Sequence, residues 1–163
     1  MKEAAAARPL VRRSLWDEDE ALRTVAFDAL KAINHPDTAF YFVPFLGEES
    51  VSARIRCVDS IAVFKDPRVA GYLLQALENC LDTIKSVEQY GQPMNVLVNR
   101  TIVMRDGTVV QLPRVRQIKP EPADKEMKSK LELEKVSILS TLRTVTGQDF
   151  GEDPAKWRAG LKK

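Results

Sequence analysis

The chain has 163 residues, of which 44% are hydrophobic and 29% are charged, and its formal net charge is +2. This composition allows one domain with a buried core over residues 1–163 and excludes a largely disordered chain. The net charge gives no indication of a polyanionic partner, and no apolar run approaches the roughly 20 residues of a membrane span.

The N-terminal residues and the cysteines predict a cytoplasmic protein that does not bind membranes. Residues 1–9 contain four alanines beside charged residues and lack the apolar stretch of a secretory signal. Cys57 and Cys80 fall at helix-core positions, which predicts buried free thiols rather than a disulfide.

The first clear helix is predicted over residues 17–33. Apolar side chains recur there at helical spacing, and the acidic residues at its start suit the positive end of a helix. Pro36 ends this segment, and the helix that follows is expected to be short or bent, because Pro44 removes a backbone donor. Residues 8–15 look like the second half of an earlier, incomplete unit.

The same pair of helices then recurs. Ser50 begins a helix of the first kind, and Asp66 and Pro67 supply the N-cap and the first-turn proline of the next helix. The apolar stripe of that helix continues to Tyr90, with a break near Asn79 as the alternative.

A shift of 31 positions superimposes these two units. Arg23 falls on Arg54, Tyr41 falls on Tyr72, and apolar residues fall on apolar ones. The other identical pairs are Asp28 and Asp59, Pro36 and Pro67, Ala39 and Ala70, and Leu46 and Leu77. A short repeat that contains two helices is typical of a stacked helical solenoid, which presents a binding face.

Residues 93–122 interrupt the helical pattern. Apolar and β-branched residues surround Asp106-Gly107, a pair that favours the type I′ turn of a two-residue hairpin. An extended connection is then predicted from three prolines, which are Pro113, Pro120 and Pro122.

The remaining residues, 123–163, predict C-terminal helices. Asp124 is the expected cap of a last long helix, which Gly147 ends. Asp153 then caps a closing turn of helix that would hold Trp157.

The repeated segment resembles a known family. Its pattern runs from Asp17 through Arg23 to Leu30, and a weaker copy runs from Glu48 through Arg54 to Ile61. This pattern is similar to HEAT-like repeats of the short type, also called phycobilisome-lyase-like repeats. The run from Thr146 to Trp157 resembles a closing segment of some bacterial HEAT-repeat proteins.

The resemblance implies a structural role for the acidic residue before each first helix and the arginine inside it. These residues link neighbouring units in the family, and here they are Asp17 with Arg23 and Glu48 with Arg54. The resemblance is nearly silent on activity. An enzyme of the bilin-lyase type shares the repeat, but it would need a chromophore pocket, for which the sequence offers no residues.

Residues that would support catalysis or metal binding are scarce. His35 is the single histidine, and it stands before Pro36 in a predicted turn, whereas metal sites and nucleophile–base pairs generally recruit several His or Cys residues. The glycines form no phosphate-binding loop. We therefore expect no enzymatic activity, no metal and no cofactor.

The first candidate site is aromatic and would bind a protein partner. Phe40, Tyr41 and Phe45 are expected to project from the outer side of the second helix, and Tyr72 and Gln75 are the repeat equivalents of Tyr41 and Pro44. The resemblance implies that second helices line a concave face, where such aromatics would serve as anchors. Alternatively, these rings fill gaps between stacked units.

The second candidate site is basic and would bind nucleic acid. Its residues crowd the predicted hairpin and its exit, and they are Arg100, Arg105, Arg114, Arg116 and Lys119. Such a ribbon could follow phosphates. A solvated strand edge is the favoured interpretation, because this stretch has no aromatic residues for base stacking.

Together these patterns predict a mainly α protein, a HEAT-like α-α superhelix or solenoid with one β-hairpin insertion. The repeats occupy residues 8–92, the insertion with its extended connection occupies 93–122, and helices occupy 123–163. The predicted function is a non-enzymatic scaffold for protein–protein interaction, with nucleic-acid binding through the basic hairpin as the alternative.

Overall fold

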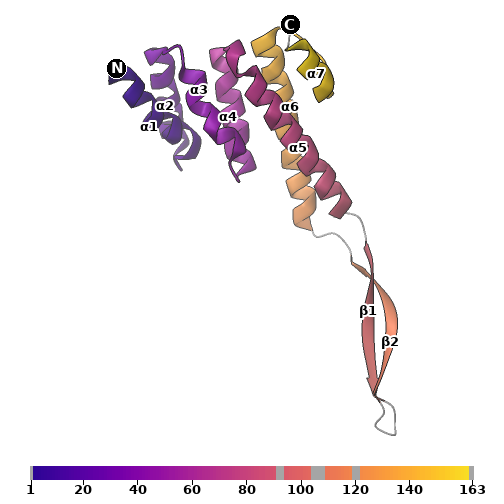
Figure 1. The fold of residues 1–163 in the computed structure, drawn as a ribbon. Coiled ribbons are helices and arrows are strands. Elements are labelled where there is room, and N and C mark those ends of the chain that lie inside the picture. The colour runs from indigo at the N-terminus through magenta and orange to yellow at the C-terminus, as the bar shows by residue number, and fades with distance from the viewer. Residues whose placement is uncertain (1, 91–93, 104–108, 119–121, 162–163) are drawn as a thin grey trace.

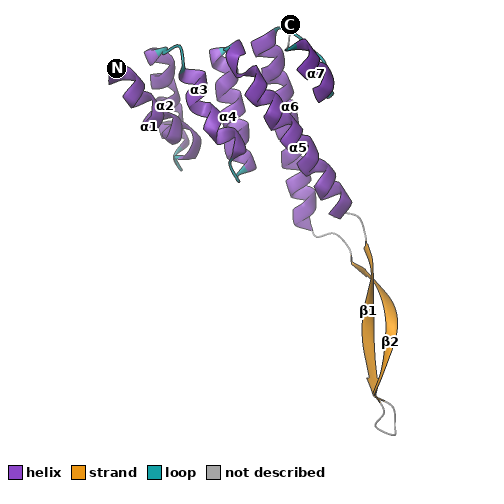
Figure 2. Ribbon diagram, in the orientation of Figure 1, coloured by secondary structure: helices purple, strands orange, loops and turns teal. Residues whose placement is uncertain are grey.

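The computed structural model describes residues 2–90, 94–103, 109–118 and 122–161, and helices dominate it (Figure 2), which confirms the prediction of a mainly α chain. The helices are α1 (Lys2–Trp16), α2 (Glu20–Ile33), α3 (Thr38–Phe42), α4 (Val51–Phe64), α5 (Ala70–Tyr90), α6 (Pro122–Thr146) and α7 (Pro154–Gly160). The 3-10 segment η1 (Val43–Gly47) follows α3, and η2 (Pro67–Val69) precedes α5. The strands are β1 (Met94–Val103) and β2 (Val109–Ile118).

Neighbouring helices lie side by side along the body of the molecule (Figure 1). Helix α1 packs against α2 and α3, α4 packs against α3, η1 and α6, and α5 packs against α6 and α7. The strands β1 and β2 extend beyond the ends of α5 and α6 (Figure 1). Among the described helices, none is both long enough and apolar enough to cross a membrane.

Helix boundaries follow the capping residues. The side chain of Asp19 accepts a hydrogen bond from the backbone N–H of Ala21 at 2.8 Å, so α2 begins at Glu20 and not at Asp17 as expected. Helix α6 begins at Pro122, which places Asp124 inside its first turn and makes the expected cap at Asp124 wrong. Proline suits the first turn of a helix, because the missing N–H has no partner there in any case.

The second helix of each unit differs in length. Helix α3 is short and passes into η1, which contains Pro44, as the sequence predicts. Helix α5 runs without interruption to Tyr90, so the alternative of a break near Asn79 is wrong. Its buried apolar stripe, which includes Leu77, Cys80 and Ile84, continues past that position and sustains the helix.

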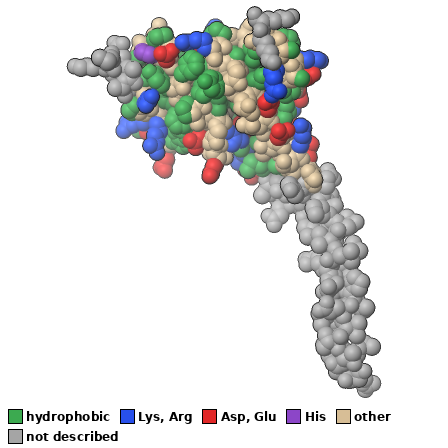
Figure 3. Space-filling model, in the orientation of Figure 1, with side chains coloured by type: hydrophobic (Ala, Val, Ile, Leu, Met, Phe, Trp, Pro, Cys, Tyr) green, Lys and Arg blue, Asp and Glu red, His purple; other side chains and the backbone are tan. Residues whose placement is uncertain are grey.

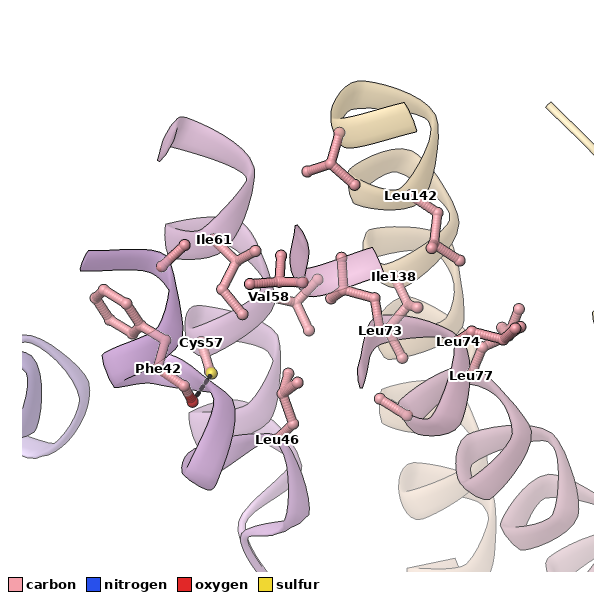
Figure 4. Packing of buried hydrophobic residues seen from close by; sticks show 14 of the residues in the cluster. Phe42, Leu46, Cys57, Val58, Ile61, Leu73, Leu74, Leu77, Ile138 and Leu142 are labelled. Atoms are coloured by element: carbon pink, nitrogen blue, oxygen red, sulfur yellow. Dashed lines mark hydrogen bonds between the residues drawn. The ribbon is translucent and has the colours of Figure 1, made fainter. Parts of the chain in front are cut away.

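The hydrophobic core runs from α1 to α7, and its part between α3, α4, α5 and α6 is shown in Figure 4. Val58 and Ile61 of α4 are fully buried with Leu73 of α5 and Ile138 of α6. Burying each side chain of this kind contributes about 1.5–3 kcal/mol. At the C-terminal end, the fully buried Trp157 donates its indole N–H to the carbonyl of Gly151 at 2.7 Å.

Helix α2 buries less of its apolar surface than its sequence suggests. Ala26 and Leu30 are buried, but Leu22 is 46% exposed and Val25 is 64% exposed. Helix α1 covers one flank of α2, and Phe27 packs against Phe42 of α3 and Phe64 of α4, but Leu22 and Val25 lie on the part of the apolar arc that these contacts leave exposed.

The strands pair in antiparallel register, with Met94 opposite Ile118 and Val103 opposite Val109. The expected turn at Asp106-Gly107 lies outside the described residues. Pro113 pairs with Asn99 inside β2, so the expectation of an extended connection from this proline is wrong. In a two-stranded sheet each strand leaves one side unpaired, and proline is tolerated at such edges.

Both cysteines are free and buried, which confirms the prediction for them. Cys57 donates its thiol to the carbonyl of Phe42 at 3.2 Å. Burial raises the pKa of both thiols, and that of Cys80 rises to about 12. Since the thiolate is the reactive form, neither side chain is suited to act as a nucleophile.

We expect both thiols to resist alkylation in the folded protein at pH 8, because their raised pKa leaves little thiolate and their burial blocks access. Mass spectrometry after treatment with iodoacetamide should show little modification under native conditions and two modifications in urea. Rapid native labelling of either residue would contradict the packing described above.

The two leucines of α2 should differ in their contribution to stability. Leu30→Ala removes a fully buried side chain and is expected to lower the free energy of unfolding by about 2–5 kcal/mol. Leu22→Ala, at an exposed position of the same helix, should lower it by less than about 1 kcal/mol. Urea unfolding followed by circular dichroism measures both, and equal losses would show that α2 buries a different flank.

Candidate functional site

The repeat-equivalent arginines make the same hydrogen bonds. Arg23 donates to the backbone carbonyls of Asp17 at 2.7 Å and Glu18 at 3.2 Å. Arg54 donates to the carbonyls of Glu48 at 2.6 Å and Glu49 at 3.2 Å. Each arginine therefore links its helix to the segment before it through main-chain oxygens. The side-chain carboxylates of Asp17 and Glu48, which the resemblance implied as partners, do not accept these hydrogen bonds.

Arg54 also links two helices through a buried ion pair. Its Nε and Nη2 donate to the two carboxylate oxygens of Glu134 in α6 at 2.6 and 2.7 Å, and the Glu134 side chain is only 3% exposed. The hydrogen bond to Glu134 raises the pKa of Arg54, so the guanidinium stays charged. A pocket of about 200 Å³ adjoins the pair, but the pair's donors and acceptors are already engaged within the protein. This site is structural.

The predicted aromatic residues of α3 and η1 are half-buried between neighbouring helices. The ring of Phe45 lies edge-on to that of Trp16 in α1, with centroids 4.8 Å apart. The ring of Tyr41 lies 5.9 Å from that of His35. These rings pack against neighbouring residues, as the alternative interpretation expects, and part of each ring remains exposed.

Tyr72 and Gln75 are exposed on α5. Tyr72 is 50% exposed, and its ring meets Phe40 edge-on at 6.2 Å. The neighbour of Tyr72 is thus Phe40 and not its repeat equivalent Tyr41. In the first unit the α-helix α3 precedes the 3-10 segment η1, whereas in the second unit the 3-10 segment η2 precedes the α-helix α5. Because the two helix types have different numbers of residues per turn, side chains at equivalent positions point in different directions. The amide of Gln75 donates to Asn79 at 3.2 Å.

These rings form one surface across three helices, which we call the aromatic face, consisting of Trp16, Phe40, Tyr41, Phe45 and Tyr72. A pocket of about 330 Å³ opens on it, lined by Phe40, Tyr41, Pro44, Phe45 and Arg8 of α1. In Figure 3 hydrophobic side chains reach the surface close to the single histidine. The face offers apolar area with an arginine at its edge.

Arg68 holds one end of the aromatic face in place. Its guanidinium lies 4.9 Å from the ring centre of Phe40 and pairs with Asp66 at 2.7 Å and Asp37 at 3.2 Å. It also donates to the carbonyl of Pro36 at 2.7 Å. The hydrogen bond between Arg68 and Asp66 raises the pKa of the arginine and lowers that of the carboxyl group.

The sequence interpretation missed Arg68, although a signal for it exists. Asp37 and Arg68 occupy equivalent positions of the two units and carry opposite charges. Stacking the units brings equivalent positions together, so this pair could have been predicted from the repeat. Glu134, by contrast, stands 80 positions from Arg54 and has no such signal.

The single histidine and the acidic residues can be placed individually. His35 accepts a hydrogen bond on Nδ1 from the backbone N–H of Asp37 at 3.2 Å, which confirms its prediction as a turn residue. Within the described ranges, no group of three or more His, Cys, Asp or Glu side chains could hold a metal ion.

The basic candidate site is described only in part. The register places Arg114 opposite Val98 and Arg116 opposite Val96, and Arg100 lies opposite Leu112. Arg105 and Lys119 lie outside the described residues.

Comparison of the chain with protein-family models, with curated proteins and with solved structures gave no match.

We expect Glu134→Ala to lower the free energy of unfolding by about 3 kcal/mol, because it leaves the buried fork of Arg54 without its carboxylate. The matched control is Glu126→Ala, which removes an exposed carboxylate paired with Lys130 on the same helix and should cost less than about 0.5 kcal/mol. Urea denaturation distinguishes the two, and equal effects would show that the Arg54–Glu134 pair does not hold α4 to α6.

Proposed function

We propose that this chain is a HEAT-like α-α solenoid with a β-hairpin insertion, and that it acts as a non-enzymatic scaffold for protein–protein interaction. The solenoid is supported by the matching hydrogen bonds of Arg23 and Arg54 and by the packing of α1 against α2, α3 against α4, and α5 against α6. The antiparallel pairing of β1 and β2 supports the insertion.

The partner would bind at the aromatic face, with Phe40, Tyr41, Phe45, Tyr72 and Gln75 as contact residues. The observation that carries this proposal is a set of partly exposed rings on α1, α3, η1 and α5, three of which line one pocket. Aromatic side chains offer large contact area at a small entropic cost, and they are enriched among the residues that dominate binding energy. The rings are already held by their neighbours, so little ordering would be required on binding.

The proposal predicts that Tyr41→Ala combined with Tyr72→Ala weakens partner binding by about 10-fold or more, since two anchors are lost. The experiment compares affinity capture by the wild-type chain, the double variant and Val63→Ala, which truncates an exposed side chain of α4 outside the aromatic face. Circular dichroism verifies that all three remain helical.

Partners captured by the wild type and by Val63→Ala, but not by the double variant, would identify ligands of the aromatic face. Capture that the double variant retains in full would refute the proposed binding surface.

A further inference from the structure

The pocket of the aromatic face has a positively charged wall. Arg8 of α1 lines it together with Tyr41 and Phe45. Residues four apart lie on the same side of a helix, so Arg12 follows Arg8 one turn later and Trp16 follows Arg12. Trp16 contacts Phe45, which lines the pocket, so Arg12 lies on the same side of α1 as Arg8 and Trp16, between a residue that lines the pocket and one that contacts its lining.

The charge of this wall is not balanced locally. Residues 7–16 contain three arginines and no acidic residue, and Arg8 and Arg12 are both exposed. Among the side chains that the structure describes, which begin at residue 7, neither has an ion-pair partner. At the other end of the face, Asp37 and Asp66 are engaged by Arg68. The open cationic surface is therefore confined to the α1 side of the pocket.

We propose that the aromatic face binds an acidic segment of its partner that also carries leucine or an aromatic residue. The apolar side chain would enter the pocket between Tyr41 and Phe45, and the flanking carboxylates would pair with Arg8 and Arg12. Arginine suits this role because its planar fork can donate two hydrogen bonds to one carboxylate. This inference rests on the proposed function and specifies the chemistry of the partner.

The geometry of the rings favours a peptide over a single-stranded nucleic acid. The rings of Trp16 and Phe45 meet at 72°, and those of Phe40 and Tyr72 meet at 83°. Binding of nucleic acid relies on open ring faces on which successive bases stack, whereas these edge-on pairs use ring faces for contacts within the protein.

The test measures fluorescence anisotropy of labelled probes with the full chain at low salt. The probes are a peptide that alternates Glu or Asp with Leu and Phe, the same peptide with Gln and Asn in place of its acids, and an oligothymidine of similar length. We expect the acidic peptide to bind about 10-fold or more tightly than its amide counterpart, and its affinity to fall as salt is added. We expect no saturable binding of the oligothymidine.

Matched variants locate the effect on α1. Arg8→Gln combined with Arg12→Gln should weaken binding of the acidic peptide about 10-fold and leave the amide peptide unaffected. Arg13→Gln, at an exposed residue on another side of the same helix, should change neither. Circular dichroism confirms that the variants fold.

The inference is overturned if the acidic peptide fails to bind at millimolar concentration, if both peptides bind equally, or if the oligothymidine binds more tightly. It is also overturned if Arg13→Gln acts as strongly as the double variant. A different result tests the proposed function. If partner capture depends on Tyr41 and Tyr72 but not on Arg8 and Arg12, the aromatic face remains the proposed binding surface and the inference of an acidic ligand is wrong.

Discussion

The packing of α4 between its neighbours is the constraint on which the rest of the structure depends. On one side, Arg56 donates to the carbonyl of Leu15 in α1 at 2.9 Å. On the other, Arg54 binds the buried carboxylate of Glu134 in α6. Burial of the Val58 side chain of α4 adds hydrophobic stabilisation to these two hydrogen-bonded contacts. Because a single helix contacts both sides, α4 fixes where α3 and α6 stand, and α5 packs on α6 in turn.

The aromatic face follows from this order of helices. Trp16 and Tyr72 belong to helices far apart in the sequence, and they share a surface because α3 and η1 lie between them. Phe40 touches Tyr72 on one side, and Phe45 touches Trp16 on the other. If the aromatic face binds a partner as proposed, its rings are held in place by the core, and pocket shape and the charge on α1 would select the ligand.

The repeat made much of the fold predictable, because residues 31 positions apart make equivalent contacts in the two units. The hydrogen bonds of Arg23 and Arg54 are the clearest case. Pairs without a repeat equivalent could not be predicted, as with Glu134. The partner of Tyr72 was also beyond prediction, because it depends on where the chain changes from an α-helical to a 3-10 turn. Apolar periodicity alone did not show that Val25 is exposed.

The most direct measurement is photocrosslinking with a photoreactive phenylalanine analogue placed in turn at the positions of Tyr41, Tyr72 and Val63, in the presence of a captured partner. If one ligand lies across α3 and α5, the analogues at 41 and 72 form adducts with a single segment of the partner, and the analogue at 63 forms none. Adducts from position 63 alone would contradict the account, as would adducts from 41 and 72 with unrelated segments.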